Sequence, residues 1–149
     1  MRILITGASG YIGGRLIDAL NLSPIEYEIT IGLRSDEEIK SYSNKRVKKV
    51  DLESLIKLDE LCKDIDTVIH LAGANARECR DNPSQAISVN TLGAANLLQA
   101  SINNGVKRFI FMSSIHVYGE LLNGEITENS YTNPTHPYSV SKKSAEDIV

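Results

Sequence analysis

Short apolar runs with high strand propensity recur along the chain at wide intervals. They are RILIT at 2–6, EITIGL at 28–33, RVKKV at 46–50, TVIHLA at 67–72 and RFIFMS at 108–113. The segments between them are long enough for helices, and apolar residues repeat at helical spacing in 11–20 and 55–61. This alternation of strand and helix predicts an α/β fold in which a parallel sheet is covered on both faces.

The longest segment between two predicted strands, residues 83–104, predicts a single long helix. Pro83 suits its first turn, and the sequence Asn-Asn-Gly at 103–105 suits its end. Since crossovers in a parallel sheet are right-handed, the carboxyl ends of all its strands open on one edge, and ligands bind there. We therefore expect the chemically unusual residues to follow directly after the strands.

Composition is that of one ordinary globular domain, residues 1–149. Of its residues 42% are hydrophobic and 23% charged, and the formal net charge is −3, which offers no basic surface for nucleic acid. No apolar run approaches the roughly 18 residues of a membrane helix, and the first residues lack the pattern of a signal peptide, so we expect a cytoplasmic protein without membrane contact. Cys62 and Cys79 have no metal-ligand spacing with the histidines, which predicts half-buried thiols and no metal site.

A glycine-rich turn follows the first predicted strand. In TGASGYIGGRL, Gly7, Gly10 and Gly13 are three residues apart and lead directly into a helix. Glycines let the backbone approach a phosphate, and the first helical turn offers free N–H groups and a favourable dipole. The alternative is a tight turn in which the glycines serve only helix packing. Because the turn lies in the first strand–helix unit, we predict dinucleotide binding by Gly7, Ser9, Gly10, Tyr11, Ile12 and Gly13.

The end of the second strand bears on which dinucleotide binds. The NAD fingerprint has a carboxylate about 20 residues beyond the glycines, which accepts from the ribose 2′-hydroxyl. Here Arg34 and Ser35 precede the first acid, Asp36. An arginine suits the 2′-phosphate of NADP, so the sequence favours NADP over NAD. The alternative is an exposed Arg34 that pairs with Asp36 or Glu37.

The ends of the third and fourth strands supply further candidates for the cofactor site. Asp51 is placed to accept from the adenine amino group, and Leu52 to line the adenine pocket. Equally open is a role for Asp51 as a helix N-cap, with Ser54 close behind. In HLAGANA at 70–76, small residues let the backbone pass beside a bound pyrophosphate and ribose, whereas His70 is expected to be a core histidine. The residues assigned to the cofactor here are Leu71, Ala72 and Gly73.

A tyrosine and a lysine stand four residues apart some way after the fifth strand. Tyr138 and Lys142 share one face of a predicted helix. A tyrosine with its ordinary pKa near 10 is a poor base at neutral pH, and an adjacent ammonium stabilises its phenolate. This spacing is common on solvated helix faces. Here, however, the glycine turn, the small-residue loop, the serines at 113–114 and this helix all fall on the predicted binding edge.

Six motifs, in order, resemble those of the extended short-chain dehydrogenase/reductases, in particular the NAD(P)-dependent nucleotide-sugar epimerase/dehydratase family. They are TGASGYIG, DL at 51–52, HLAG, NTLGAANLLQA, FIFMSSIHVYGE and YSVSK. The resemblance covers the whole chain and implies a Rossmann-type doubly wound parallel sheet that ends before a C-terminal substrate region. It also implies NADP or NAD as cofactor, a nucleotide sugar as substrate, hydride transfer between the two, and a homodimer as a plausible assembly.

The resemblance implies a role for each of four residues. Tyr138 is the general acid/base, and Lys142 lowers its pKa and bonds the nicotinamide ribose. Ser114 hydrogen-bonds the reacting sugar oxygen. Asn90 orders the backbone of the active site and is counted with Tyr138 and Lys142 among the cofactor residues. The alternative for Asn90 is a polar position in an amphipathic helix.

The chain departs from the family's pattern just after Ser114. Ile115 and His116 stand where the 4,6-dehydratases have acids, which disfavours a dehydratase and leaves an epimerase or a reductase. His116 is expected to pack in a loop; an additional acid/base role is the alternative. Two other functions stay open: a non-catalytic NAD(P)-binding module and a reductase of a non-sugar ketone.

Overall fold

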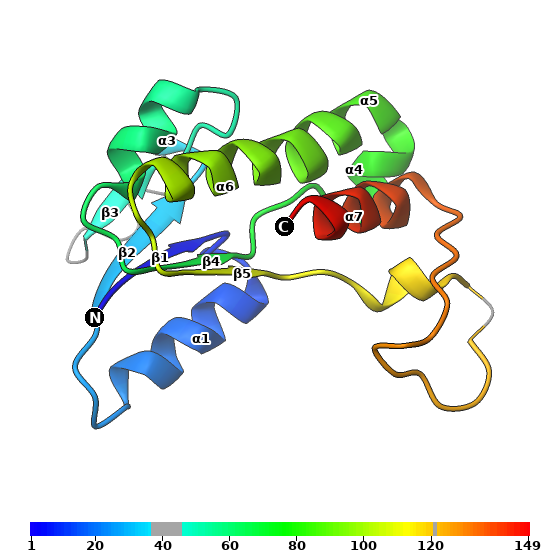
Figure 1. The fold of residues 1–149 in the computed structure, drawn as a ribbon, viewed down its shortest axis with the longest axis horizontal. Helices are drawn as coiled ribbons and strands as arrows, with labels where there is room; N and C mark the ends of the chain where they lie inside the picture. Colours follow the sequence, from blue (N-terminus) through cyan, green and yellow to red (C-terminus); the bar gives the residue numbers. More distant parts are fainter. Residues whose placement is uncertain (37–45, 121) are drawn as a thin grey trace.

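Five parallel strands form one sheet in the computed structural model, which describes residues 1–36, 46–120 and 122–149 (Figure 1). Its strands are β1 (Arg2–Thr6), β2 (Glu28–Leu33), β3 (Val47–Lys49), β4 (Thr67–His70) and β5 (Arg108–Phe111). Their order is β3-β2-β1-β4-β5, and every pairing is parallel. Strands β2 and β3 extend the sheet on one side of β1, and β4 and β5 extend it on the other. This reversal between β1 and β4 confirms the doubly wound sheet predicted from the sequence.

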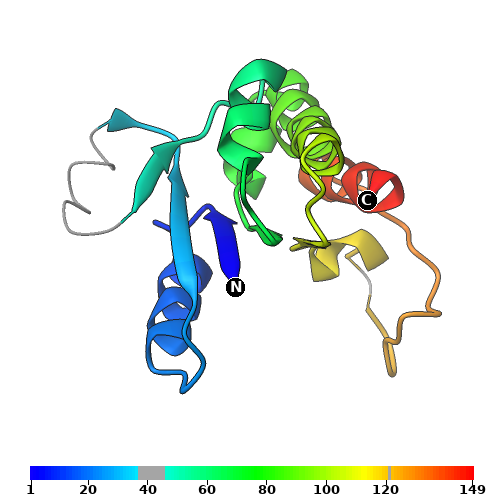
Figure 2. The same cartoon turned by 60° about the vertical axis from the view of Figure 1, so that its left-hand side comes forward.

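Helices lie on both faces of this sheet. Helix α1 (Tyr11–Asn21) covers one face, and α3 (Leu55–Cys62), α6 (Gly93–Asn103) and α7 (Pro137–Ile148) lie on the other (Figures 1 and 2). The shorter helical elements are α4 (Ala76–Asp81), α5 (Pro83–Ala86), the π-helical η1 (Ile87–Leu92) and the 3₁₀-helical η2 (Ile115–Tyr118).

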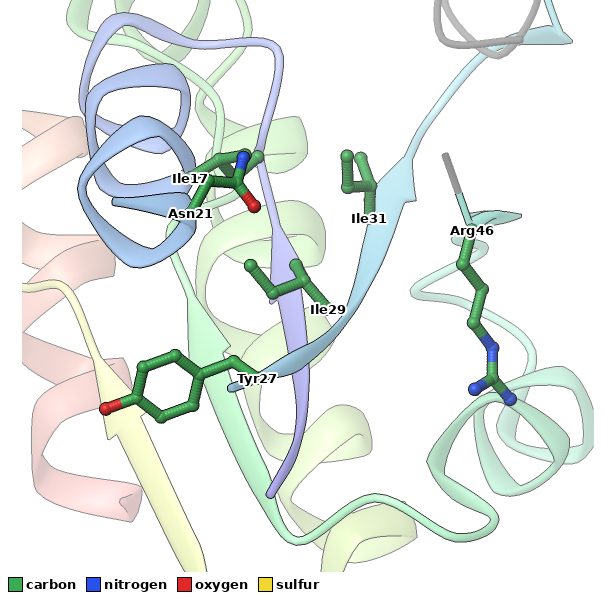
Figure 3. Close-up of a pocket in the computed structure, with 6 residues that line it drawn as sticks. All are labelled: Ile17, Asn21, Tyr27, Ile29, Ile31 and Arg46. Carbon is green, nitrogen blue, oxygen red and sulfur yellow. The ribbon is translucent and has the colours of Figure 1, made fainter. Parts of the chain in front are cut away.

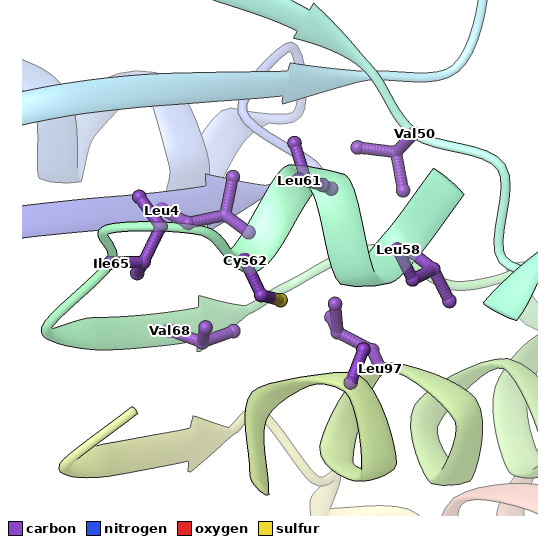
Figure 4. Packing of buried hydrophobic residues seen from close by; sticks show 9 residues of the cluster. Leu4, Val50, Leu58, Leu61, Cys62, Ile65, Val68 and Leu97 are labelled. Carbon is purple, nitrogen blue, oxygen red and sulfur yellow. The ribbon is translucent and has the colours of Figure 1, made fainter. Parts of the chain in front are cut away.

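Each face of the sheet has its own apolar core, and β1 contributes to both. Successive side chains of a strand point to opposite faces, so a strand covered on both sides needs apolar residues at every position. Ile3 and Ile5 pack toward α1. Leu4 packs on the other side, in a cluster with Leu58 of α3 and Leu97 of α6 (Figure 4). The unbroken apolar run of β1 thus reflects its central place in the sheet.

The helix predicted at 83–104 is present, but its winding changes along its length. The segment is divided into α5, a six-residue π-helical stretch and α6. The π-helical stretch contains Asn90, which is fully buried. Such stretches occur frequently at functional sites. An apolar pattern close to helical period does not reveal this local change of winding.

The two cysteines are more deeply buried than predicted. Cys62 and Cys79 are free thiols with no exposed surface, and burial raises the pKa of both.

Within the described ranges, no group of three or more His, Cys, Asp or Glu side chains is arranged to hold a metal ion. No helix in the same ranges combines the length and the hydropathy of a membrane span.

Candidate functional site

A cavity of about 540 Å³ opens where β1, β2, β3 and β4 end. Nine residues that the sequence assigns to a cofactor line it: Gly7, Ser9, Gly10, Arg34, Asp51, Leu52, Leu71, Ala72 and Gly73. They come from four separate strand–loop junctions, which the parallel sheet brings to one edge. We call this the main cavity.

A second cavity, of about 180 Å³, lies elsewhere. It is lined by Ile17, Asn21, Tyr27, Ile29, Ile31 and Arg46, between α1 and β2 (Figure 3). It reaches toward the amino end of β2, where Tyr27 stands directly before the strand. Because no residue predicted for the site lines it, the main cavity is the candidate functional site.

The glycine turn brings the end of β1 against the loop after β4. Gly7 has a φ of +71°, a conformation that side chains disfavour. A Cβ atom on Gly7 would lie 2.5 Å from the backbone nitrogen of Ala72, and one on Gly13 would lie 2.5 Å from the carbonyl oxygen of Gly7. Gly7 therefore lets two cavity-lining loops meet, and Gly13 lets α1 start directly on the turn.

The first turn of α1 faces this junction without a side-chain cap. Gly10 is its N-cap and has no side chain to offer the first-turn N–H groups, while its own N–H donates to the Gly7 carbonyl at 3.1 Å. Tyr11 and Ile12 do not line the main cavity, and they are 83% and 52% exposed. Of these two residues, only the backbone is placed for a ligand at the turn.

A buried pair of side chains joins the ends of β1 and β4. Thr6 Oγ1 and His70 Nδ1 are hydrogen-bonded at 2.6 Å, and Thr6 Oγ1 also accepts from the backbone N–H of Ala72 at 3.4 Å. His70 is fully buried, as expected for a core histidine, and burial, reinforced by the charge of Lys142, lowers its pKa to about 3. Its Nε2 has no hydrogen-bond partner among the described residues. The neutral ring lies 5.9 Å from that of Phe111, measured between centroids.

Two basic residues stand together on the β2–β3 side of the main cavity. Arg34 and Lys49 both line it, although only Arg34 was predicted. Asp36 accepts from Lys49 Nζ at 3.0 Å. Glu37, the other partner suggested for Arg34, lies outside the described residues. This wall therefore carries two cations and a nearby carboxylate.

Asp51 lines the main cavity, but both of its oxygens are engaged within the protein. Oδ2 accepts from Lys57 Nζ at 2.9 Å, and Oδ1 accepts from the backbone N–H of Glu53 at 3.2 Å. The bond from Lys57 lowers the pKa of this carboxyl group. The N-cap of α3 is Ser54, so the alternative that Asp51 caps the helix is wrong.

Asn90 forms hydrogen bonds inside the protein and does not line the main cavity. Its Oδ1 accepts from the Ala74 N–H at 2.7 Å, and its Nδ2 donates to the Ala74 carbonyl at 3.2 Å and to Ser141 Oγ at 2.9 Å. A Cβ atom on Gly73 would lie 2.8 Å from Oδ1. Asn90 thus holds the backbone after β4 and connects it to α7, next to Lys142.

Tyr138 and Lys142 lie on α7 with unequal exposure. Tyr138 is partly buried and packs against the cluster that contains Cys79, and the ring of His116 meets it edge-on with the centroids 6.2 Å apart. Lys142 is 5% exposed, and its Nζ lies 4.0 Å from the centroid of the Phe111 ring. Burial lowers the pKa of Lys142 to about 8, and nearby Cys79 and Glu146 act in the opposite direction.

Ser114 caps the short helix that packs on α7. Its Oγ accepts from the backbone N–H of His116 at 3.3 Å, and η2 contacts α7. Ser114, Tyr138 and Lys142 do not line the main cavity. Tyr138 adjoins it, because Val89 both lines the cavity and packs in the same cluster as Tyr138. The structure therefore has two neighbouring parts, a cavity and a corner formed by η2 and α7.

The main cavity also has lining residues that sequence reasoning missed: Thr6, Gly32, Leu33, Lys49, Val50, Glu53, Asn75, Glu78, Gln85 and Val89. Gly32 carried a signal, since a glycine inside an apolar strand marks a close approach, and a Cβ atom here would lie 2.6 Å from Val50 Cγ2. Asn75 and Glu78 carried another, because they have capping-box spacing and form that box at α4. Gln85 and Val89 had none, because their place depends on the turn between α4 and α5.

Comparison with known proteins identifies the family and relatives of the same fold. The family model described as "NAD dependent epimerase/dehydratase family" matches residues 3–149. The fold is similar to that of the UDP-Glc/GlcNAc 4-epimerase of Campylobacter jejuni, with 27% identity, a TM-score of 0.84, and coverage of 99% of this chain and 47% of that one.

Two other solved structures contain a cofactor. The dTDP-glucose 4,6-dehydratase DesIV of Streptomyces venezuelae, with NAD and TYD bound, is 25% identical with a TM-score of 0.84, over 99% of this chain and 50% of that one. RMD of Pseudomonas aeruginosa, complexed with NADPH, is 31% identical with a TM-score of 0.79, over 99% of this chain and 46% of that one. The chain thus spans about half the length of these relatives.

Proposed function

The chain belongs to the NAD-dependent epimerase/dehydratase family, and we propose that it is the cofactor-binding part of an enzyme that epimerises or reduces a nucleotide sugar. The observation that carries this proposal is the main cavity of about 540 Å³, with the glycine turn at one side and the buried Lys142 in the adjoining corner. A pure binding module needs the glycine turn but has no use for a buried ammonium beside a tyrosine.

The glycine turn suits the pyrophosphate of a dinucleotide. A Cβ atom at Gly7 would fill the junction with Ala72, and Gly10 leaves the first turn of α1 open toward it. Helix amino termini favour anions through their free N–H groups and dipole. In this proposal Gly7, Ser9, Gly10 and the backbone of the next two residues hold the phosphates, while Leu52 and residues 71–73 line the nucleoside parts. When bound, the cofactor supplies the hydride chemistry.

Two cations support NADP as the preferred cofactor. Arg34 and Lys49 line the β2–β3 wall, and arginine and lysine both bind phosphate groups. Asp36 already pairs with Lys49, which leaves this carboxylate less suited to accept from the free 2′-hydroxyl of NAD. The β2–β3 side of the main cavity therefore combines two positive charges with a carboxylate that is already in an ion pair.

Tyr138, Lys142 and Ser114 are assigned the proton chemistry. Tyr138 exchanges a proton with the sugar hydroxyl or ketone oxygen, because a phenolate stabilised by a neighbouring ammonium is a competent base. Lys142 keeps most of its charge at pH 7, since its pKa of about 8 lies above that pH. The Ser114 oxygen accepts from His116 N–H, so its own hydrogen is available to donate to the same sugar oxygen.

A dehydratase is disfavoured by the residues beside Tyr138. Elimination of water needs a group that removes a carbon-bound proton and one that protonates the leaving hydroxyl. Ile115 has no such group, and the ring of His116 packs edge-on against Tyr138. An epimerase or a reductase requires only the proton chemistry assigned above.

Calorimetric titration of the purified chain with NADP and with NAD tests the proposal. We expect binding of both, and the Arg34→Ala variant should bind NADP about tenfold more weakly with little change for NAD, because only NADP has the additional phosphate. Arg108→Ala is the matched control, since Arg108 begins β5 at the opposite end of the strands. Failure to bind either dinucleotide at millimolar concentration contradicts the proposal, and equal weakening of NAD and NADP contradicts the role of Arg34.

A further inference from the structure

A hydrogen bond connects the end of β5 to the last turn of α7. Ser113 Oγ donates to Glu146 Oε2 at 2.8 Å, between residues 33 positions apart. Ser113 directly precedes Ser114, which caps η2. The bond therefore joins the segment that presents Ser114 to the helix that carries Tyr138 and Lys142.

Glu146 also occupies a defined place on that helix. Tyr138, Lys142 and Glu146 are successive i, i+4 positions and so form one stripe along α7. On the next stripe, Lys143 forms an ion pair with Asp147. The two acids of the last turn thus have different partners: Asp147 pairs with the partly buried Lys143, and Glu146 accepts from Ser113.

The surroundings of Lys142 explain why a carboxylate one turn away matters. The ammonium is almost completely buried over the Phe111 ring, and removal from water disfavours its charged form. The titratable groups that act on it are Cys79 of α4, His70 of β4 and Glu146 of α7 itself. Burial lowers the pKa of His70 and raises that of the Cys79 thiol, and Glu146 is the carboxylate of this set.

We propose that Glu146 is a positioning residue of the site, which fixes α7 to the end of β5 through Ser113 and places a carboxylate one helical turn from Lys142. Both effects act on the same group. The bond to Ser113 holds the carboxylate in place, and the carboxylate in turn favours the charged form of Lys142 inside an apolar corner. Its relevance to catalysis rests on the proposed function; the contact and its effect on Lys142 do not.

The test is the titration of Lys142 in the ligand-free chain, followed by NMR of ¹³C-labelled lysine and assigned with Lys142→Arg. We expect Glu146→Gln, which keeps the shape and a hydrogen-bond acceptor but removes the charge, to lower the pKa of Lys142 by about half a pH unit or more. Asp147→Asn is the matched control on the same helical turn and should change it by less than about 0.2, because Asp147 is paired with Lys143 on the next stripe.

Ser113→Ala separates the two parts of the proposal. It retains the charge and removes the bond that holds it, so the pKa of Lys142 should fall in the same direction by a smaller amount. An unchanged pKa in a folded Glu146→Gln variant, or an equal change in Asp147→Asn, overturns the proposal. If Glu146→Gln does not fold, Ser113→Ala decides in its place, and an unchanged pKa there has the same meaning.

Titration of the same samples with NADP and NAD keeps this result apart from the proposed function. A wild-type chain that binds neither dinucleotide but whose Lys142 responds to Glu146→Gln contradicts the proposed function and supports the role of Glu146. A chain that binds both dinucleotides but whose Lys142 is indifferent to Glu146 supports the proposed function and overturns the role of Glu146.

Discussion

The two ends of the candidate site are held together in different ways. At the glycine end, where Gly7 meets Ala72, backbone lies directly against backbone, and a single added carbon would come within 2.5 Å of it. At the tyrosine end, side chains connect segments distant in the sequence. Asn90 bonds Ser141 across 51 positions, and Ser113 bonds Glu146 across 33.

The difference shows that one end of a site can depend on the absence of a side chain, and the other end on hydrogen bonds between side chains. A close backbone approach is specified by one residue, because only glycine leaves the space free. A side-chain tie needs two residues to meet in the folded chain, and a buried partner left alone is costly. The stability of the glycine end should therefore be sensitive to substitutions that add a side chain, and that of the tyrosine end to substitutions that remove one.

The largest effect is expected from an addition at the glycine end. Gly7→Ala combines an unfavourable φ with a clash against backbone atoms, so it should lower the free energy of unfolding by about 3 kcal/mol or more and abolish dinucleotide binding. Gly14→Ala is the control, because nothing lies within 4 Å of its Cβ position in α1. That variant should be stabilised by about 0.5–1 kcal/mol. Equal urea midpoints for the two variants would show that the steric account of Gly7 is wrong.

The second-largest effect is expected when the Asn90 side chain is removed at the tyrosine end. Asn90→Ala leaves the Ala74 backbone groups and Ser141 without their buried partner, which should lower the free energy of unfolding by about 2–3 kcal/mol. Hydrogen exchange should accelerate at residues 73–75 before it changes at the glycine turn. Asn103→Ala, at an exposed position, is the control and should cost less than about 0.5 kcal/mol. If the two asparagine variants melt alike, the tie does not hold the loop.

The smallest effect concerns His70, which touches both ends through Thr6 and Phe111. Its pKa is about 3 when folded and near 6.5 when unfolded, so below pH 6.5 the unfolded chain binds more protons. The contribution to stability is therefore complete above pH 6.5 and is lost as the pH falls toward 3. Between pH 6.5 and 5, before most carboxylates titrate, the free energy of unfolding should fall by about 1 kcal/mol per pH unit.

Urea unfolding at a series of pH values measures this slope. His70→Gln should flatten it, whatever its effect on overall stability, and His116→Gln, at an exposed position, is the control. A wild-type chain with constant stability between pH 6.5 and 5 would mean that His70 is protonated, or reaches water, in the folded state.

Those parts of this protein that depend on neighbours along the chain could be predicted from the sequence. Strand and helix periods within windows of a few residues were sufficient for five parallel strands and for the edge at which they end. The glycine turn was recognisable because its steric requirement belongs to single residues. Nine cofactor candidates line one cavity because each comes shortly after a strand, and a parallel sheet brings the ends of its strands to one edge.

Features that depend on partners distant in the sequence could not be predicted in this way. The π-helical winding around Asn90, the engagement of Asp51 by Lys57, and the part that Gln85 and Val89 take in the cavity follow from packing between elements. The spacing of Tyr138 and Lys142 was visible in the sequence, but the burial of Lys142 over Phe111 was not. Burial and its effect on pKa arise from atoms contributed by several elements, and no local pattern specifies which of them will meet.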